Sequence, residues 1–284
     1  MISAGPNDLW VFIRPVWVFV LVLLCIFLIA VFAPFVTSHD PNYQNLLARL
    51  KPPGYSTDSR FYLLGTDELG RDLLTRIVYG ARISLLVAFL SVSISLIFGV
   101  LIGMVAGYFR GFLEVLIMRM ADIFLSIPAI LLAILTVAVL GPSLLNLVLV
   151  LAFTRWPRYT RVAYAQTLSV AGSLYIKSSA YSGASNTRIL MRHILPNILA
   201  PLIVLATLEF GLMILFEGGL SFLGLGVQPP MPSWGSILSV GRNYISSAWW
   251  IVTLPGICLF VVVLSINVLG DFLRDKFDPR SLGR

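Results

Sequence analysis

The amino-acid sequence predicts an all-α, polytopic membrane protein with six transmembrane helices. Of the 284 residues, 58% are hydrophobic and only 12% are charged, about half the charged fraction of an ordinary soluble domain. Both a water-soluble globule and a disordered chain are excluded by this balance. Four long stretches contain no Asp, Glu, Lys or Arg, and they run from Arg14 to Asp40, Arg82 to Arg110, Asp122 to Arg155 and Arg242 to Asp271.

Each charge-free stretch can hold at least one helix of the roughly 20 apolar residues needed to cross a membrane. The stretch from Ile123 to Thr154 is too long for one helix, and Gly141-Pro142 in its middle is a strong turn signal. We therefore place a hairpin there and accept Arg155 near the membrane boundary. The predicted spans are about 15–36, 84–106, 117–140, 143–163, 197–219 and 249–270.

The distribution of basic residues predicts the orientation. The stretch 155–193 contains no acidic residue and six basic ones, which marks a cytoplasmic loop. The segment 37–81 is balanced in charge and is placed outside, so six spans leave both termini in the cytoplasm. The first span is too long for the apolar part of a signal peptide and is expected to remain as an anchor. The predicted segments are 1–14 (cytoplasmic), 15–36 (anchor), 37–82 (outer), 83–270 (five-helix core) and 271–284 (cytoplasmic tail).

No catalytic, phosphate-binding or metal-binding motif occurs in the sequence. There is no H-E-x-x-H, no G-x-S-x-G and no glycine-rich loop ending in Gly-Lys. Cys25 and Cys258 lie in different apolar spans and are interpreted as packing residues. We expect no enzyme and no bound cofactor or metal; an integral-membrane enzyme is the weaker alternative. The net charge of +7 is attributed to topology rather than to a nucleic-acid partner.

Two outer loops have unusual compositions. In the segment 64–86, Thr66 or Asp67 is expected to cap a helix, which is either an interfacial helix or a ligand-contacting surface. The segment 220–238 is rich in Gly and Pro yet keeps apolar side chains such as Trp234. It is either a loop that dips into the mouth of a pathway or a rigid packed loop in the aromatic belt.

The inner loop 175–197 is longer than a simple connection requires. Gly183 interrupts a first helical segment, and Ser185 can cap a second one. The sequence therefore predicts a helix–turn–helix that projects into the cytoplasm. It is either a docking lever for a cytoplasmic partner or a solvated basic loop.

Short strings of residues along the chain resemble those of the permease subunits of bacterial ABC importers of the dipeptide, oligopeptide and nickel group. The likeness is to the second, or C-type, of their two permeases, and it implies a type I, MetI-like permease core. The matching strings follow the family order and are Gly65–Asp72, Gly80–Leu85, Arg119–Asp122 with Pro128, Leu220–Gly226, Pro232–Gly235, Trp249-Trp250, Pro255-Gly256, Gly270–Arg274 and Asp278–Arg280.

The resemblance implies that the cytoplasmic loop 164–196 couples this chain to an ATPase. The residues that match the family's coupling motif are Gly183, Ala184, Ser185, His193, Pro196 and Asn197. Its opening differs, because Lys177, Ser178 and Ser179 stand where Glu-Ala-Ala is usual. The change reverses a charge and removes two good helix formers. Either the partner ATPase compensates with an acidic residue, or coupling is weaker.

The resemblance also implies the partners: a homologous permease that forms a heterodimer with this chain, two cytoplasmic P-loop ATPases that hold ATP and Mg, and an extracytoplasmic substrate-binding protein. The complex would lie among the lipids of a bacterial cytoplasmic (inner) membrane. In the periplasmic loop 220–248 and the span before it, the candidate pathway or outer-gate residues are Glu209, Glu217, Phe222, Gly224, Gly226 and Trp234.

Two questions stay open at the level of the sequence. Glu209 and Glu217 either line the pathway, where they would meet a cationic group such as a peptide amino terminus, or pair across helices. The cargo is a peptide, a nickel chelate, glutathione or another small solute, and peptide is adopted as the default. The rival function is a solitary secondary transporter or channel, which usually shows internal repeats that are not evident here.

Overall fold

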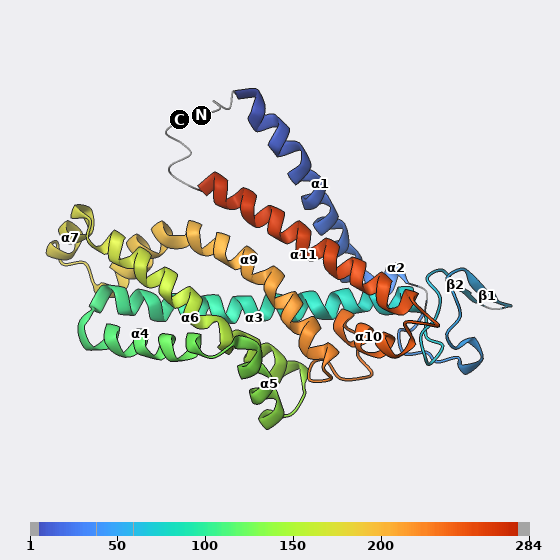
Figure 1. The fold of residues 1–284 in the computed structure, drawn as a ribbon. Coiled ribbons are helices and arrows are strands. Elements are labelled where there is room, and N and C mark those ends of the chain that lie inside the picture. Colours follow the sequence, from blue (N-terminus) through green and yellow to red (C-terminus); the bar gives the residue numbers. More distant parts are fainter. Residues whose placement is uncertain (1–5, 38, 59, 278–284) are drawn as a thin grey trace.

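The computed structural model describes residues 6–37, 39–58 and 60–277, and this part of the chain is built almost entirely of helices (Figure 1). Residues 1–5 and 278–284 of the predicted terminal segments lie outside the described residues. The elements in chain order are α1 (Pro6–Val31), α2 (Ala33–Val36), η1 (Leu46–Ala48), β1 (Tyr55–Thr57), β2 (Arg60–Tyr62), α3 (Leu73–Phe109), α4 (Gly111–Ser126), α5 (Ala129–Leu140), α6 (Leu144–Ala171), α7 (Leu174–Tyr181), α8 (Asn186–Arg188), η2 (Ile189–Ile194), α9 (Leu195–Phe222), α10 (Trp234–Gly241), η3 (Arg242–Tyr244) and α11 (Trp250–Phe277).

The all-α prediction is confirmed for this part of the chain, where the strands β1 and β2 form only one short antiparallel hairpin. The hairpin lies at one end of the molecule, and α7 lies at the opposite end (Figure 1). Helix α3 runs between these ends (Figure 1) and packs mainly on α6 and α9, while α1 packs mainly on α11.

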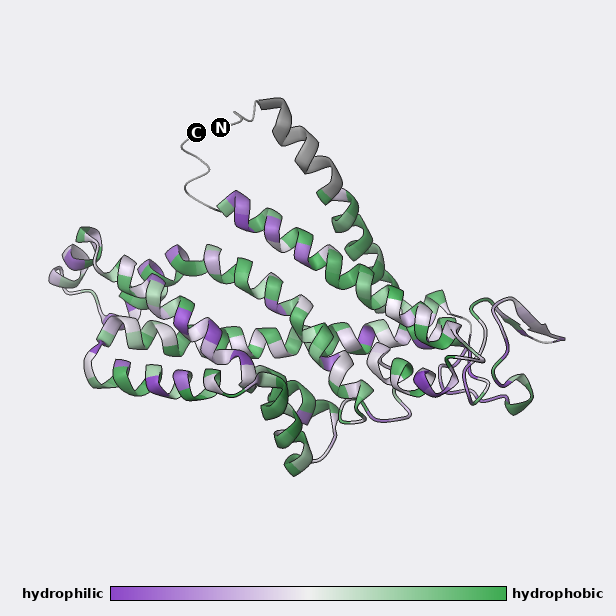
Figure 2. Cartoon of the chain, in the orientation of Figure 1, coloured by the Kyte–Doolittle hydropathy of each residue, from purple (hydrophilic) through white to green (hydrophobic). Residues whose placement is uncertain are grey.

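Each predicted span coincides with a helix or a helix pair, but length and composition do not yield six spans. Three helical stretches among the described residues are long and apolar enough to cross a membrane: α3, α11 and the stretch Asn186–Phe222, which comprises α8, η2 and α9. The bent pair α4–α5 makes a fourth if it counts as one span. The described apolar part of the first helix is only Val16–Val31. Helix α6 carries Arg155, Arg158 and Arg161 in its middle, and hydrophilic segments interrupt the hydrophobic colouring of this helix in Figure 2.

The prediction of one helix over 117–140 is wrong. Helix α4 ends at Ser126, and α5 begins at Ala129 after a bend of 90°. Ile127 is extended because the ring of Pro128 disfavours helical backbone in the residue before it. The turn at Gly141 is confirmed, since Gly141 has φ +81° and α6 starts three residues later. The inner end of α6 was placed too early, because the helix continues to Ala171.

The predicted cap of the helix before the second span is also wrong. Asp72 begins α3, and its Oδ2 accepts hydrogen bonds from the Thr75 amide (2.8 Å) and hydroxyl (2.5 Å). Thr66 instead donates its hydroxyl to the Ala48 carbonyl, and Asp67 binds the Arg71 side chain at 2.6 Å. Both earlier candidates are therefore engaged in holding the outer loop, which leaves Asp72 to cap the helix.

A row of glycines brings α3 and α6 into direct backbone contact. A Cβ atom on Gly99 would lie 2.6 Å from the Trp156 carbonyl oxygen, and one on Gly103 would lie 2.5 Å from that of Thr160. Gly107 continues the same row one turn further along. Small residues at every fourth position allow such close approach between membrane helices. This seam makes α3 and α6 one rigid unit.

Two apolar clusters form the core, one toward each end of the long helices. The outer cluster reaches Leu151 on α6 and Met213 on α9. The inner cluster begins at Tyr159 on α6 and includes Leu202 on α9. The middle turns of both helices lie between the clusters, and Arg155, Arg158 and Glu209 occur there.

Candidate functional site

The inner loop folds as the predicted helix–turn–helix. Gly183 adopts φ +82°, and the Ser185 hydroxyl accepts a hydrogen bond from the Arg188 amide at 3.3 Å. Lys177, Ser178 and Ser179 lie on α7, whose single buried residue is Ile176. The rest of α7 is therefore a surface that the described part of this chain does not cover.

The second half of the loop joins α9 through a π-helical turn. Pro196 has no N–H to donate to the carbonyl four residues earlier, and the wider turn over 189–194 accommodates this loss. The side-chain amide of Asn197 donates hydrogen bonds from Nδ2 to the His193 carbonyl oxygen (2.6 Å) and to the Tyr175 hydroxyl oxygen (3.2 Å). This contact clamps α7 to the start of α9.

Of the predicted coupling residues, Ser179, Gly183, Ala184 and His193 line one depression, and Lys177, Ser178, Ser185, Pro196 and Asn197 do not. An open depression of about 410 Å³ lies between α7 and the π-helical turn, and its lining is Ser179, Ser182, Gly183, Ala184, Arg188, Arg192 and His193. It presents hydroxyl groups and two arginines to the surface. Such a depression can accept side chains of a protein partner.

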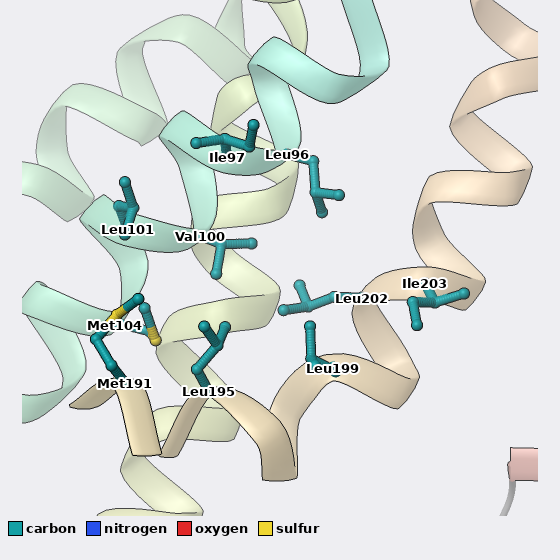
Figure 3. A pocket seen from close by; sticks show the side chains of 10 residues that line it. All are labelled: Leu96, Ile97, Val100, Leu101, Met104, Met191, Leu195, Leu199, Leu202 and Ile203. Atoms are coloured by element: carbon teal, nitrogen blue, oxygen red, sulfur yellow. The ribbon is translucent and has the colours of Figure 1, made fainter. Parts of the chain in front are cut away.

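A second cavity lies next to the π-helical turn, between α3 and the start of α9 (Figure 3). Its volume is about 340 Å³, and Val100, Met104, Met191 and Leu202 are among its lining residues. All ten side chains that line it are apolar. The cavity therefore lacks the polar groups that orient a specific ligand.

At the other end, Glu217 is fully buried and holds the outer loop against α3. Its Oε2 accepts a hydrogen bond from Ser84 on α3 (2.7 Å), and its Oε1 accepts one from Ser221 (2.7 Å). The two hydroxyl oxygens in turn accept the backbone N–H groups of Trp234 (3.3 Å) and Val227 (3.1 Å). One carboxylate thus joins α3, α9, the loop and α10.

The predicted gate residues form a packed loop within this chain. Trp234 is 1% exposed, and its indole N–H donates to the Ile77 carbonyl at 3.0 Å. Gly224 has φ +79°, and a Cβ on Gly226 would collide with Ser221. Phe222 is 37% exposed and ends α9. These contacts correspond to the packed alternative for this loop.

Glu209 pairs with arginines of α6. Its Oε1 accepts a hydrogen bond from Arg158 Nη1 at 2.8 Å, and its Oε2 lies 3.7 Å from Arg155 Nη1. The Arg155 guanidinium also lies over the ring of Phe216 at 4.3 Å. Glu209 therefore makes the cross-helix pair that was one of its two predicted roles.

Sequence reasoning missed Arg155 and Arg158 as site residues. It treated them as topology signals and placed Arg155 near the membrane boundary, whereas the structure has both in the middle of α6. Their spacing of three residues on a helix, opposite a span that contains an acidic residue, was the available signal. No group of His, Cys, Asp or Glu among the described residues could hold a metal ion.

A further ionic cluster stabilises the loop before α3. Arg71 contacts Asp67 at 2.6 Å and Glu68 at 2.7 Å, and Arg76 lies 3.4 Å from Asp67. Burial and the neighbouring Asp67 charge raise the pKa of Glu68 above its usual value. All of these groups have partners within the loop, so the cluster has a structural role.

Long apolar helices joined to an exposed helix–turn–helix indicate a membrane-spanning protein, and comparison with known proteins identifies the family. Residues 99–282 match the binding-protein-dependent transport system inner membrane component family, and residues 14–53 match the N-terminal transmembrane domain of oligopeptide transport permease C. The chain belongs to the binding-protein-dependent transport system inner membrane component family. The predicted resemblance is confirmed.

Similar proteins include two dipeptide permeases. The chain is 47% identical over 261 residues to the di/tripeptide transport system permease protein DppC of Pseudomonas aeruginosa, covering 92% of this chain and 86% of that protein. It is 45% identical over 259 residues to the dipeptide transport system permease protein DppC of Escherichia coli, covering 91% and 86%. The inward-facing MetNI methionine ABC transporter shares the fold, with a TM-score of 0.56 and 22% identity over 71% of this chain and 95% of that chain.

Proposed function

We propose that this chain is the second permease subunit of an ATP-driven importer of dipeptides in a bacterial cytoplasmic membrane, with both termini in the cytoplasm. The observation that carries the proposal is the identity of 45–47% to dipeptide permeases over more than nine-tenths of the chain. A homologous permease completes the pathway, and two cytoplasmic ATPases bind ATP and Mg. A substrate-binding protein on the outer side delivers the peptide.

The inner loop is the proposed contact with an ATPase. Helix α7 offers a surface that is largely uncovered, next to the depression between α7 and the π-helical turn. The Tyr175–Asn197 hydrogen bond and the packing of Ile176 with Ile189 and Ile194 join α7 to α9. A force on α7 therefore reaches a membrane helix. ATP binding changes transport only through contacts that differ between two conformations.

The altered opening of the coupling motif sets a requirement for the partner. Lys177 is exposed on α7, so its ammonium group points to solvent or to a docked protein. In other members of the family, the permease carries a glutamate at the position of Lys177. We therefore expect the ATPase partner of this chain to carry an acidic residue at the point where it contacts Lys177. Such a charge exchange would maintain coupling and would add selectivity for the cognate ATPase.

The outer loop is the proposed gate. Phe222, Gly224, Gly226 and Trp234 lie in or next to a loop whose backbone is held by hydrogen bonds to serine hydroxyls. These hydroxyls donate hydrogen bonds to the buried carboxylate of Glu217. Because these hydrogen bonds attach the loop to α9, it would gate the pathway by moving with the outer end of that helix.

Co-purification and transport test the proposal. The tagged chain is expressed with the proteins encoded next to its gene, purified in detergent and placed in liposomes with dipeptide-loaded binding protein. We expect recovery of a second permease and two ATPases, with ATP hydrolysis and dipeptide uptake that both require the binding protein. Uptake by the chain alone, without ATP, would instead establish the solitary transporter.

Lys177→Glu tests the charge exchange in the same assay, with Arg60→Glu on the outer hairpin as a matched control. Lys177→Glu should lower the hydrolysis that is stimulated by the binding protein, whereas Arg60→Glu should leave ATPase assembly unchanged. Full coupling in the Lys177→Glu complex would refute the requirement for an acidic partner residue.

A further inference from the structure

A cluster with surplus positive charge lies half-way along α6 and α9. Two guanidinium groups, those of Arg155 and Arg158, face the single carboxylate of Glu209. Neighbouring carboxylates are engaged elsewhere, since Asp122 pairs with Arg161 at 2.5 Å and Glu217 accepts hydrogen bonds from serines. The cluster therefore carries one uncompensated positive charge.

The hydrogen-bonding capacity of the arginines is not used up. The Arg155 side chain is 6% exposed, and among the described residues neither its buried Nε–H nor the buried Oε2 of Glu209 has a hydrogen-bond partner. Its Nη1 lies 3.7 Å from Glu209 Oε2, which is an ionic contact but too long for a hydrogen bond. Buried polar groups without a partner are rare in folded proteins. The contact with Phe216 places the Arg155 guanidinium beside Glu209, where it contributes positive charge while its Nε–H stays buried.

The cluster can be reached from one side. The side chain of Arg158 is 48% exposed, while that of Glu209 behind it is 1% exposed. Charged side chains at membrane depth face protein or a water-filled cavity rather than lipid, because lipid cannot solvate them. The open side of Arg158 therefore faces either a water-filled space or a neighbouring protein.

We propose that Arg158, with the positive charge of Arg155 behind it, binds the terminal carboxylate of a peptide during its passage between the permease subunits. The inference rests on the proposed function. A guanidinium group matches a carboxylate through paired N–H donors, and this match requires the carboxylate to be ionised. Glu209 orients the arginines and limits the net charge to one, so that binding stays weak enough for release. The site thus binds the carboxyl end of the peptide. In the alternative given by the sequence, Glu209 would instead bind the amino end.

The test compares a dipeptide with its C-terminal amide, which lacks the negative charge. Both are delivered to the complete importer in liposomes, at concentrations that saturate the binding protein for each ligand. The wild-type complex should transport the acid about tenfold faster than the amide, a factor that corresponds to about 1.4 kcal/mol. Arg158→Gln should remove this preference by lowering the rate for the acid to about that for the amide.

Arg161→Gln is the matched control, because Arg161 is equally exposed on the same helix but is neutralised by Asp122. It should keep the preference for the acid. The proposal is overturned if the wild-type complex moves both peptides equally, or if Arg158→Gln keeps the preference. Should Arg158→Gln fail to assemble, Arg158→Lys must show a reduced preference, and an unchanged one overturns the proposal. A wild-type complex that moves neither peptide refutes the proposed function itself.

Discussion

Replacing Glu217 with alanine should loosen the outer loop while leaving the membrane helices in place. The carboxylate is fully buried and accepts hydrogen bonds at 2.7 Å from Ser84 and from Ser221. Each hydroxyl also accepts a backbone N–H, from Trp234 and from Val227. Removal of the carboxylate leaves two buried hydroxyl donors without an acceptor and frees the loop on which they act.

The size of the effect follows from the number of hydrogen bonds lost. Leaving a buried donor unsatisfied costs about 1–3 kcal/mol, while hydrogen bonds between membrane helices couple by roughly 0.5–2 kcal/mol. We therefore expect Glu217→Ala to lower the free energy of unfolding by about 2–4 kcal/mol, taking the lower part of the range for each of the two donors. Glu217→Gln keeps one acceptor oxygen and should cost about half as much.

The assay is equilibrium unfolding in mixed detergent micelles, followed by tryptophan fluorescence. A double-mutant cycle with Ser84→Ala isolates the bond between α3 and α9 from the rest of the network. The two substitutions should show a coupling free energy of about 0.5–2 kcal/mol. Additive effects, or a Glu217→Ala protein as stable as the wild type, would refute the reasoning.

Three further predictions concern packing, capping and pH. Gly103→Ala should lower the free energy of unfolding by about 1–3 kcal/mol, because the new Cβ would lie 2.5 Å from the Thr160 carbonyl oxygen. Gly219→Ala is the control and should not lower it, because its Cβ would meet nothing within 4 Å among the described residues. Unfolding in detergent compares the two variants. Asp72→Ala should cost about 1–2 kcal/mol by loss of the α3 cap, and equal stability by the same assay would contradict this. The raised pKa of Glu68 means that its contribution to stability is complete below 4.5 and is lost as the pH rises through the raised value. Glu68→Gln should remove this pH dependence of thermal unfolding, and an unchanged profile would show that another group causes it.

The positions of the helices were predictable because absence of charge over 20 or so residues has few explanations other than a membrane span. The helix–turn–helix was predictable because Gly183 and Ser185 act on their own immediate backbone. The break at Pro128 was missed because apolar residues continue on both sides of it, so that hydropathy alone shows one uninterrupted segment. There the local stereochemistry of proline outweighs the pattern.

The cap of α3 shows a different limit. Thr66, Asp67 and Asp72 are all acceptable caps by local criteria. The choice among them is made by contacts distant in sequence, since Thr66 is bound to the Ala48 carbonyl and unavailable to the helix. Such a choice depends on the folded loop and cannot be read from a short window of sequence.

The polar centres of the site depend even more on the tertiary structure. Arg158 and Glu209 are separated by 51 residues, and Ser84 and Glu217 by 133. The sequence identified both glutamates as unusual, because an acidic residue inside a span needs a partner. It could not tell which glutamate meets a cation and which meets hydroxyl groups, because that depends on how α3, α6 and α9 pack.

Helix α9 carries three of these features along its length. Its inner end is clamped to α7 through Asn197, its middle is paired with α6 through Glu209, and its outer end is tied to α3 through Glu217. The glycine seam holds α3 and α6 together as one body. Any shift of α9 along that body must stretch the Arg158–Glu209 and Ser84–Glu217 contacts together, because both cross the same boundary. A displacement that starts at α7 would therefore alter the charge presented at the middle of α6 and the anchoring of the outer loop in one step, without a separate signal to each site.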